Sequence, residues 1–393
     1  MIDWRGIDLL NKNFGIDVVE NMIVYTVFYL ITVVIVDYAV RDLAASPSEA
    51  GLAAGIFIIA GLVGRMLAGK WIASVGMKKM LYIGLVIFLV ATLLYFGVEN
   101  LFMLYIVRFL HGLGFGISST STGTIVAKII PKGRYGTGIG YYALSVTGAT
   151  ALGPFLGIYL YQNGNFDLIL ILCSILLFFN CIMAVILKVP EMELTEEQMR
   201  EIKKFSLNSF FEKKAFSISF IGAFMGLCYA GIVSFISSYA REIGLADVGS
   251  LYFVVYAVCI LLSRPFVGKL FDDKNENFVM YPSFIFFAAG LFLLGIMDNW
   301  WLFLLAGVFV GLGYGNFTPV GQAIAVKKAP SHHVGLATAT FFAIFDAGMG
   351  IGPFILGFVV SQTGFRGLYM VSAAIIIVCM ILYYFWHGRY IKN

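Results

Sequence analysis

The chain has 393 residues, of which 60% are hydrophobic and only 12% are charged, and its formal net charge is +4. Soluble domains carry about 25% charged residues, so this composition excludes a soluble globular protein. No arginine-rich arm or basic stripe indicates a nucleic-acid partner. We therefore predict an all-α integral membrane protein that is embedded in a lipid bilayer.

Twelve apolar runs are long enough to cross a bilayer as helices, since a spanning helix needs about 20 residues. The predicted spans are 21–41, 50–69, 79–97, 101–127, 137–161, 168–187, 214–239, 247–269, 279–297, 301–326, 335–361 and 367–386. The charged link 188–213 predicts a cytoplasmic connector between an N-terminal bundle (1–187) and a C-terminal bundle (214–393). Asp17 and Glu20 precede the first span, so we expect them at the inner membrane surface.

The two halves of the sequence repeat at an offset of 199 positions. The offset aligns Arg65 with Arg264, Gly69 with Gly268, Gly112 with Gly311, Gly153 with Gly352, and Pro154 with Pro353. A single offset that holds from the second predicted span to the fifth is hard to obtain by chance. The repeat therefore predicts two pseudo-symmetric six-helix bundles related by an axis along the membrane normal.

The basic residues indicate an orientation for these spans. Of the 26 lysines and arginines, three lie in the expected outer links, three lie within spans, and the others lie in the inner segments. Inner loops of membrane proteins are enriched in Lys and Arg, so we expect a multi-pass protein of the cell membrane with both termini in the cytoplasm. The five cysteines lie in apolar runs without C-x-x-C spacing, and we expect no metal site and no cofactor.

The stretch Gly64-Arg-Met-Leu-Ala-Gly-Lys-Trp71 differs from a nucleotide-binding P-loop by one residue. Trp71 stands where that loop needs a hydroxyl, and a membrane helix precedes the glycines instead of a strand, which excludes an ATP site. The position instead predicts a cytoplasmic hairpin between spans 2 and 3. The residues that we assign to this hairpin signature and to its second copy are Arg65, Gly69, Gly76, Lys78, Arg264, Gly268 and Asp272.

This hairpin resembles the loop signature G-x-x-x-D-[RK]-x-G-[RK]-[RK] of the major facilitator superfamily of transporters, and the span count and the repeat extend the resemblance over the whole chain. In the family, the aspartate of this loop is thought to latch a neighbouring helix end. Ala73 replaces that aspartate here, so only Asp272 in the second half supplies such a latch.

Two further motifs resemble proton-coupled members of that family. Arg108-Phe-Leu-His-Gly112 looks like their R-x-x-x-G motif. The segment Ala149–Gly157 is similar to the G-x-x-x-G-P-x-x-G motif of the drug:proton antiporters. The Gly-Pro residues of this segment and of its second copy are Gly153, Pro154, Gly157, Gly352 and Pro353. A packing kink with no role in transport direction is the alternative interpretation.

Charged side chains within spans cost about 2.5–3.5 kcal/mol each, so each of them suggests a function. We predict proton coupling through Asp37, Arg108 and Asp346, with Asp37 and Arg108 forming a pair. The alternatives are an interfacial Asp37 and an Asp346 that only packs against a neighbouring helix. Arg65 and Arg264 lie five residues from Lys70 and Lys269, so we expect them to extend toward the cytoplasmic surface.

The predicted function is proton-coupled efflux of a small organic or drug-like compound by alternating access, in a transporter that acts as a monomer and not as an enzyme. The side chains that we predict to line the substrate cavity are Ser119, Thr122, Tyr229, Ser234, Asn316 and Gln322. A sugar or other metabolite transporter and a lipid flippase remain alternatives. A membrane enzyme is disfavoured because no catalytic motif occurs in a suitable context.

Overall fold

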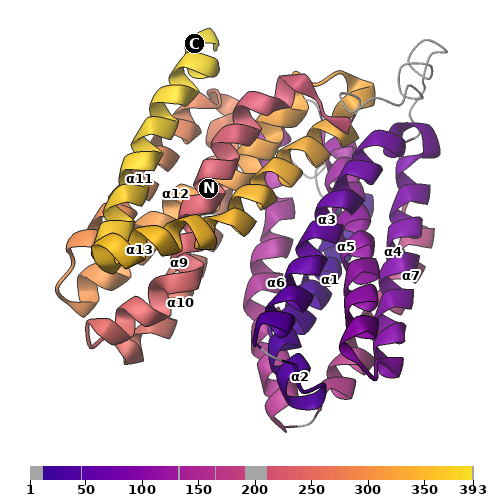
Figure 1. Cartoon of the computed structure of the whole chain (residues 1–393). Helices are drawn as coiled ribbons and strands as arrows, with labels where there is room; N and C mark the ends of the chain where they lie inside the picture. The colour runs from indigo at the N-terminus through magenta and orange to yellow at the C-terminus, as the bar shows by residue number, and fades with distance from the viewer. Residues whose placement is uncertain (1–11, 46, 132, 164, 191–209, 392–393) are drawn as a thin grey trace. The chain divides into compact units, whose positions relative to one another are not determined.

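The described residues form helices and connecting turns in the computed structural model, with no strand among them. The structure describes residues 12–45, 47–131, 133–163, 165–190 and 210–391 (Figure 1). The helices are α1 (Lys12–Thr32), α2 (Ile35–Asp42), α3 (Pro47–Val75), α4 (Met77–Leu94), α5 (Leu101–Ile129), α6 (Tyr135–Asn163), α7 (Phe166–Ile186), α9 (Phe216–Glu242), α10 (Ala246–Asp273), α11 (Asn277–Ile296), α12 (Trp300–Lys328) and α13 (Val334–Trp386). The all-α prediction is confirmed.

Eleven helical segments in the described part of the chain are long and apolar enough to cross a membrane. The helix α6, with 29 residues, occupies the fifth predicted span. Two of the segments, Ser331–Gly352 and Ile355–Tyr390, include most of α13, and the non-helical Gly364, where φ is +69°, lies inside the second of them. The first predicted span, 21–41, is wrong at both ends, because the first candidate span is Lys12–Thr32 and α2 forms a separate short helix.

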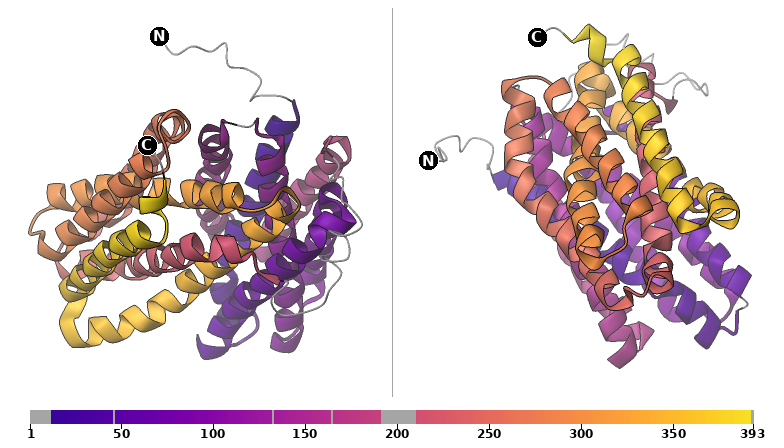
Figure 2. Two further views of the ribbon diagram at one scale, coloured as in Figure 1. Left: turned by 90° about the horizontal axis from the view of Figure 1, so that it is seen from above. Right: turned by 90° about the vertical axis from the view of Figure 1, so that its left-hand side faces the viewer.

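Two compact units are present in the chain. Unit 1 comprises residues 1–131, 142–212 and 329–340, and unit 2 comprises residues 132–141, 213–328 and 341–393. In unit 1, α5 packs against α1, α3 and α4, while α7 packs against α1 and α4; in unit 2, α12 packs against α9, α10 and α11 (Figures 1 and 2). Each unit is therefore built around one central helix, and α5 and α12 occupy equivalent positions of the sequence repeat.

Glycines at repeat-equivalent positions allow these central helices to approach their neighbours closely. A Cβ atom on Gly114 of α5 would overlap the backbone of Phe88 in α4, and a Cβ on Gly313 of α12 would overlap the backbone of Phe287 in α11. These two contacts are related by the same offset of 199 that relates the motifs. The glycines noted in the sequence thus serve close helix packing, as small residues do at helix interfaces in membranes.

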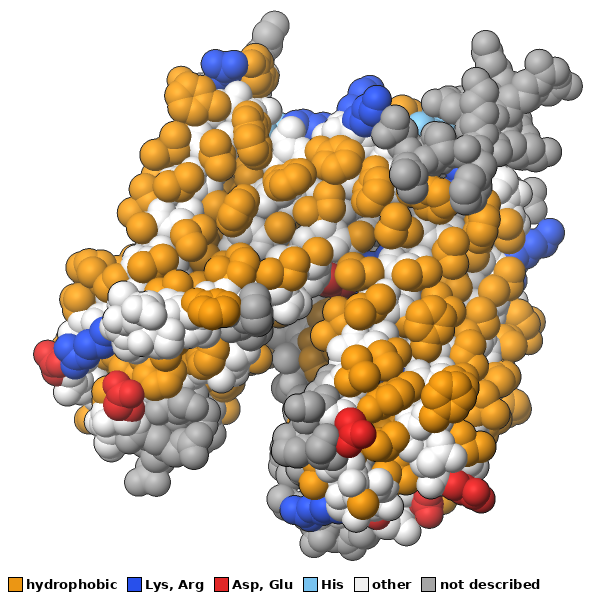
Figure 3. Space-filling model, in the orientation of Figure 1, with side chains coloured by type: hydrophobic (Ala, Val, Ile, Leu, Met, Phe, Trp, Pro, Cys, Tyr) orange, Lys and Arg blue, Asp and Glu red, His pale blue; other side chains and the backbone are white. Residues whose placement is uncertain are grey.

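Hydrophobic side chains cover much of the helix surface, whereas many of the charged side chains lie near helix ends (Figure 3). Phe102 and Phe266 are 71% and 72% exposed, respectively. Exposing so much aromatic and aliphatic surface to water is unfavourable, whereas contact of this surface with lipid chains is favourable. The surface therefore agrees with a protein that spans a bilayer.

Candidate functional site

Two carboxylates near the start of α1 are fully buried, contrary to the expectation that they lie at the membrane surface. Asp17 and Glu20 are each 0% exposed, and neither side chain has a hydrogen-bond partner within the described part of the chain. Glu20 and Asn21 follow Asp17 by three and four residues, so each of them adjoins Asp17 on the helix surface. The hydropathy of the segment did not reveal them, but the spacing of three polar residues in an otherwise apolar helix is a signal for a buried polar face.

A chain of hydrogen bonds joins α1, α5 and α6 next to these carboxylates. The Tyr142 hydroxyl donates to Thr122 Oγ1 (2.9 Å), which donates to Asn21 Oδ1 (3.0 Å). The Asn21 amide in turn donates to Ser145 Oγ (2.7 Å), whose hydroxyl donates to the carbonyl of Tyr142 (2.6 Å). All four residues are buried. Thr122 lies in this buried network, and its role in lining a substrate cavity stays a prediction.

Arg108 lies fully buried in α5. Its Nε donates to the carbonyl of Ala53 (2.9 Å) in α3, and its guanidinium carbon lies 4.4 Å from the centre of the Phe57 ring. The Nη2 group has no hydrogen-bond partner among the described residues. The side chain of Asp37 lies outside the described residues, so its predicted pairing with Arg108 stays a prediction.

Arg65 and Arg264 do not extend to the surface, so that expectation was wrong. They are only 2% and 6% exposed. The Arg65 guanidinium lies 5.5 Å from the centre of the Phe115 ring, and this aromatic neighbour stabilises a cation inside the unit. Lysines at helix ends can snorkel, but these two arginines are enclosed by neighbouring helices and are held within their spans.

Asp272, at the end of α10, binds the first turn of α6. Its two carboxylate oxygens accept hydrogen bonds from the backbone N–H groups of Gly136 and Thr137, each at 2.9 Å. Those N–H groups have no acceptor within their own helix, and the helix dipole favours a negative charge at this end. Gly268 makes this approach possible, since a Cβ there would overlap Thr137.

The equivalent position in unit 1 is Ala73, which has no carboxylate to offer. Gly69 still packs closely against the first turn of α13, where a Cβ would overlap the Ala339 side chain. A different carboxylate lies near the start of α13: Glu212 Oε2 is 2.6 Å from Nδ1 of His333, which directly precedes this helix. The backbone contact of the second half therefore has no direct copy at Ala73.

Glu276, in the link between α10 and α11, lies close to two basic side chains. It lies 3.0 Å from Lys327 Nζ and 3.3 Å from His387 Nε2. Burial alone would raise the pKa of Glu276, but the hydrogen bonds from His387 and Lys327 and the lysine charge together lower it to about 2. The carboxylate is therefore ionised and acts as a fixed structural anion.

The six predicted cavity residues are divided between the two units: Ser119 and Thr122 belong to unit 1, and the other four belong to unit 2. Ser119, Asn316 and Gln322 are almost fully buried, whereas Ser234 is exposed. The Tyr229 ring stacks on Tyr314 with their centres 3.8 Å apart. Asp346 and Tyr229 are half-buried.

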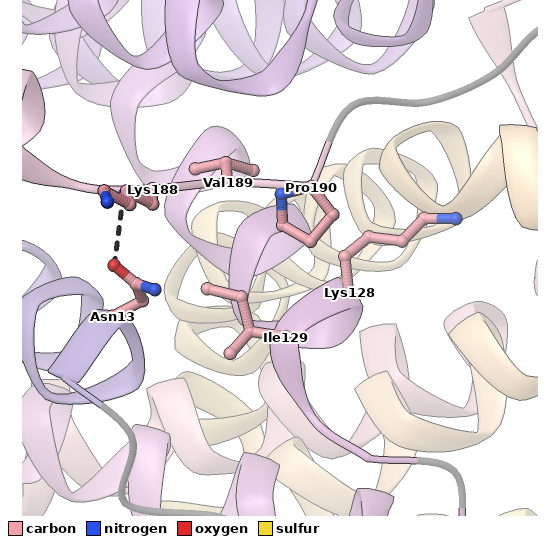
Figure 4. A pocket seen from close by; sticks show the side chains of 6 residues that line it. All are labelled: Asn13, Lys128, Ile129, Lys188, Val189 and Pro190. Atoms are coloured by element: carbon pink, nitrogen blue, oxygen red, sulfur yellow. Dashed lines mark hydrogen bonds between the residues drawn. The ribbon is translucent and has the colours of Figure 1, made fainter.

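A small cavity of about 350 Å³ lies elsewhere, near the start of α1 (Figure 4). Its lining residues are Asn13, Lys128, Ile129, Lys188, Val189 and Pro190. The Asn13 side chain accepts a hydrogen bond from the Lys188 backbone at 3.0 Å. This cavity contains none of the residues predicted to contact substrate.

The glycines of the Gly-Pro motifs pack against neighbouring helices. A Cβ on Gly153 would meet Tyr29 in α1, one on Gly157 would meet Leu30, and one on Gly352 would meet Leu227 in α9. The side chains of Pro154 and Pro353 lie outside the described part. Close packing of α6 on α1 and of α13 on α9 is therefore the role that the geometry of these glycines supports.

The model of the Major Facilitator Superfamily matches residues 21–293 and 276–390. The chain belongs to this superfamily. An uncharacterised transporter of the same type from Methanocaldococcus jannaschii is 27% identical over 353 residues, which cover 88% of this chain and 90% of that protein. The multidrug resistance protein MdtG of Salmonella paratyphi A is 26% identical over 181 residues, 44% of this chain and 45% of that protein.

Several solved transporter structures share the fold of this protein. A bacterial homologue of the iron transporter ferroportin superimposes with a TM-score of 0.81 at 14% identity, over 96% of this chain and 100% of that one. The transporter FucP superimposes with a TM-score of 0.78 at 12% identity, over 96% and 99%. The protein is thus a multi-pass membrane transporter and not an enzyme.

Proposed function

We propose that this transporter exports a small lipophilic or cationic organic compound across the cell membrane in exchange for protons, by alternating access of a central site. The observation that carries the proposal is the set of ionisable side chains buried within the spans, because such groups are costly and mark ion or proton pathways. Arg108 and Arg65 belong to this set. The similarity of part of the chain to a multidrug resistance protein supports the substrate class.

In this proposal Asp37, Arg108 and Asp346 contribute to proton coupling, and both termini face the cytoplasm. Asp346 is half-buried in α13, next to the glycine-rich stretch that ends in Gly352. Asp272 contributes to gating, because its carboxylate binds the first turn of α6. Release of that contact would let the two helix ends separate during the transport cycle.

Flux through purified protein in proteoliposomes tests this function. The lumen is made acidic, the membrane potential is clamped with valinomycin and equal potassium, and accumulation of labelled tetraphenylphosphonium and ethidium is followed. Protons leaving the lumen should drive these cations inward, and nigericin should abolish the accumulation. A labelled sugar in a parallel sample tests the metabolite alternative. Cation accumulation that is the same with and without the pH gradient contradicts the proposal.

A further inference from the structure

We propose that Asp17 of α1 is a further carboxylate that binds and releases a coupled proton, in addition to Asp37 and Asp346, an inference that rests on the proposed proton-coupled export. Asp17 was expected at the membrane surface but is 0% exposed, and neither carboxylate oxygen has a hydrogen-bond partner within the described residues. No motif of the sequence marks this position. The structure alone brings it into the interior of unit 1.

A buried carboxylate without a donor cannot remain ionised at low cost. Transfer of an isolated charge into a low-dielectric interior is so unfavourable that the group takes up a proton instead. No hydrogen-bond donor among the described residues compensates such a charge on Asp17, whereas Asp272 accepts two backbone hydrogen bonds and Glu276 lies within 3.3 Å of two basic side chains. The conformation described here is therefore the proton-loaded one at Asp17.

The hydrogen-bonded network beside Asp17 offers a route for that proton. Asp17 lies within electrostatic range of the Tyr142 hydroxyl, which donates to Thr122. Thr122 continues through Asn21 to Ser145, so polar groups of three helices meet at this point. A carboxylate at the edge of a hydroxyl network exchanges its proton when a change of conformation admits water there.

Glu20 is equally buried, but it faces a different environment. The charge of Lys78 in α4 acts on Glu20, and an Asn180 amide of α7 donates to the Glu20 carbonyl at 3.2 Å. The lysine charge offsets part of the cost of burying an ionised Glu20, whereas the charge that acts on Asp17 is the like charge of Glu20. Glu20 is therefore the matched control, since it resembles Asp17 in burial, helix and chemistry.

The titratable and charged groups around Asp17 come from several helices. Glu20 lies one turn away on α1 and Tyr142 on α6, while Arg65 of α3 acts on the same Tyr142 hydroxyl. Lys78 of α4 and Cys181 of α7 lie near Glu20 instead. On α5 the neighbouring group of the network is the neutral Thr122.

The proton step needs no other reactant. An O–H bond forms on Asp17 when the carboxylate takes up a proton from the outer solution, and the same bond breaks when the proton leaves to the inner solution. Because Asp17 lies near the beginning of α1, which we place at the cytoplasmic side, opening of that side hydrates the carboxyl and favours release.

Infrared spectroscopy and transport together test the proposal. The carbonyl stretch of a protonated carboxylic acid differs from the bands of an ionised carboxylate, and it needs no transported compound. Purified protein should show this band at neutral pH; Asp17→Asn should lose one carboxylic-acid component of the band, and Glu20→Gln should keep that component. A band that is identical in wild type and Asp17→Asn overturns the proposal.

The transport arm uses labelled tetraphenylphosphonium in proteoliposomes. Asp17→Asn should lose accumulation driven by the pH gradient but retain exchange of labelled against unlabelled cation, which shows that the variant is folded. Asp17→Glu should restore the gradient response, and Glu20→Gln should keep it. A gradient response retained by Asp17→Asn overturns this inference alone, whereas a wild-type protein that ignores the gradient overturns the proposed function and the inference with it.

Discussion

The contact between Asp272 and the first turn of α6 allows a quantitative prediction. The carboxylate accepts two backbone hydrogen bonds at 2.9 Å from Gly136 and Thr137. A hydrogen bond to a charged group contributes about 1.5–3 kcal/mol. Because Asp272 is only half-buried, we take the lower part of this range, about 3 kcal/mol for both bonds together. This energy corresponds to a roughly 100-fold change in the opening equilibrium.

Hydrogen–deuterium exchange of the peptide 133–141 measures this contact directly. The N–H groups at the start of a helix have no acceptor within it, so their protection depends on Asp272. Asp272→Ala should speed exchange of the Gly136 and Thr137 amides in this peptide by about 100-fold, and Asp272→Asn, which keeps one acceptor oxygen, should give a smaller increase. Asp273→Ala is the matched control, since Asp273 is exposed and should change nothing. Equal protection in wild type and Asp272→Ala refutes the reasoning.

Three further outcomes are expected from single changes. The pKa of Glu276 is lowered to about 2 from its ordinary 4.5, so its stabilisation is present above pH 4.5 and is lost as the pH falls toward 2. Glu276→Gln should therefore have a free energy of unfolding about 2 kcal/mol lower than wild type at pH 7, after allowance for the exposed lysine. This difference in unfolding free energy should disappear in acid, and a difference that does not depend on pH contradicts the prediction. Gly313→Ala should lower the free energy of unfolding by about 1–3 kcal/mol, because the added Cβ pushes α12 away from the backbone of Phe287 in α11. An unchanged melting temperature argues against that contact. Arg108→Lys should lose about 2 kcal/mol, because lysine cannot keep both the Ala53 bond and the stacking on Phe57; thermal unfolding of the purified variant measures the loss, and wild-type stability would disprove it.

The helical architecture and the repeat could be predicted from the sequence because they depend on local patterns. Long apolar runs must form helices in lipid, and an offset of 199 relates Gly114 to Gly313 as well as their contact residues Phe88 and Phe287. The first span was misplaced because Asp17 and Glu20 lower the hydropathy of a segment that neighbouring helices nevertheless bury.

The polar contacts could not be predicted, because they join residues that lie far apart in the chain. Asn21 and Ser145 are separated by 124 positions, and no local pattern relates them. The burial of Arg65 and Arg264 depends in the same way on which helices surround them. Snorkelling was a sound expectation for isolated helices, but packing within each unit decided otherwise.

Proton release on substrate binding tests the central claim most directly. Tetraphenylphosphonium is added to the purified protein in weakly buffered detergent solution, and the pH is followed with an indicator dye. An antiporter in which cation and proton exclude one another should release protons on the order of one per protein, with an amount that saturates as the cation binds. Saturable binding of the cation with no release of protons would contradict the account.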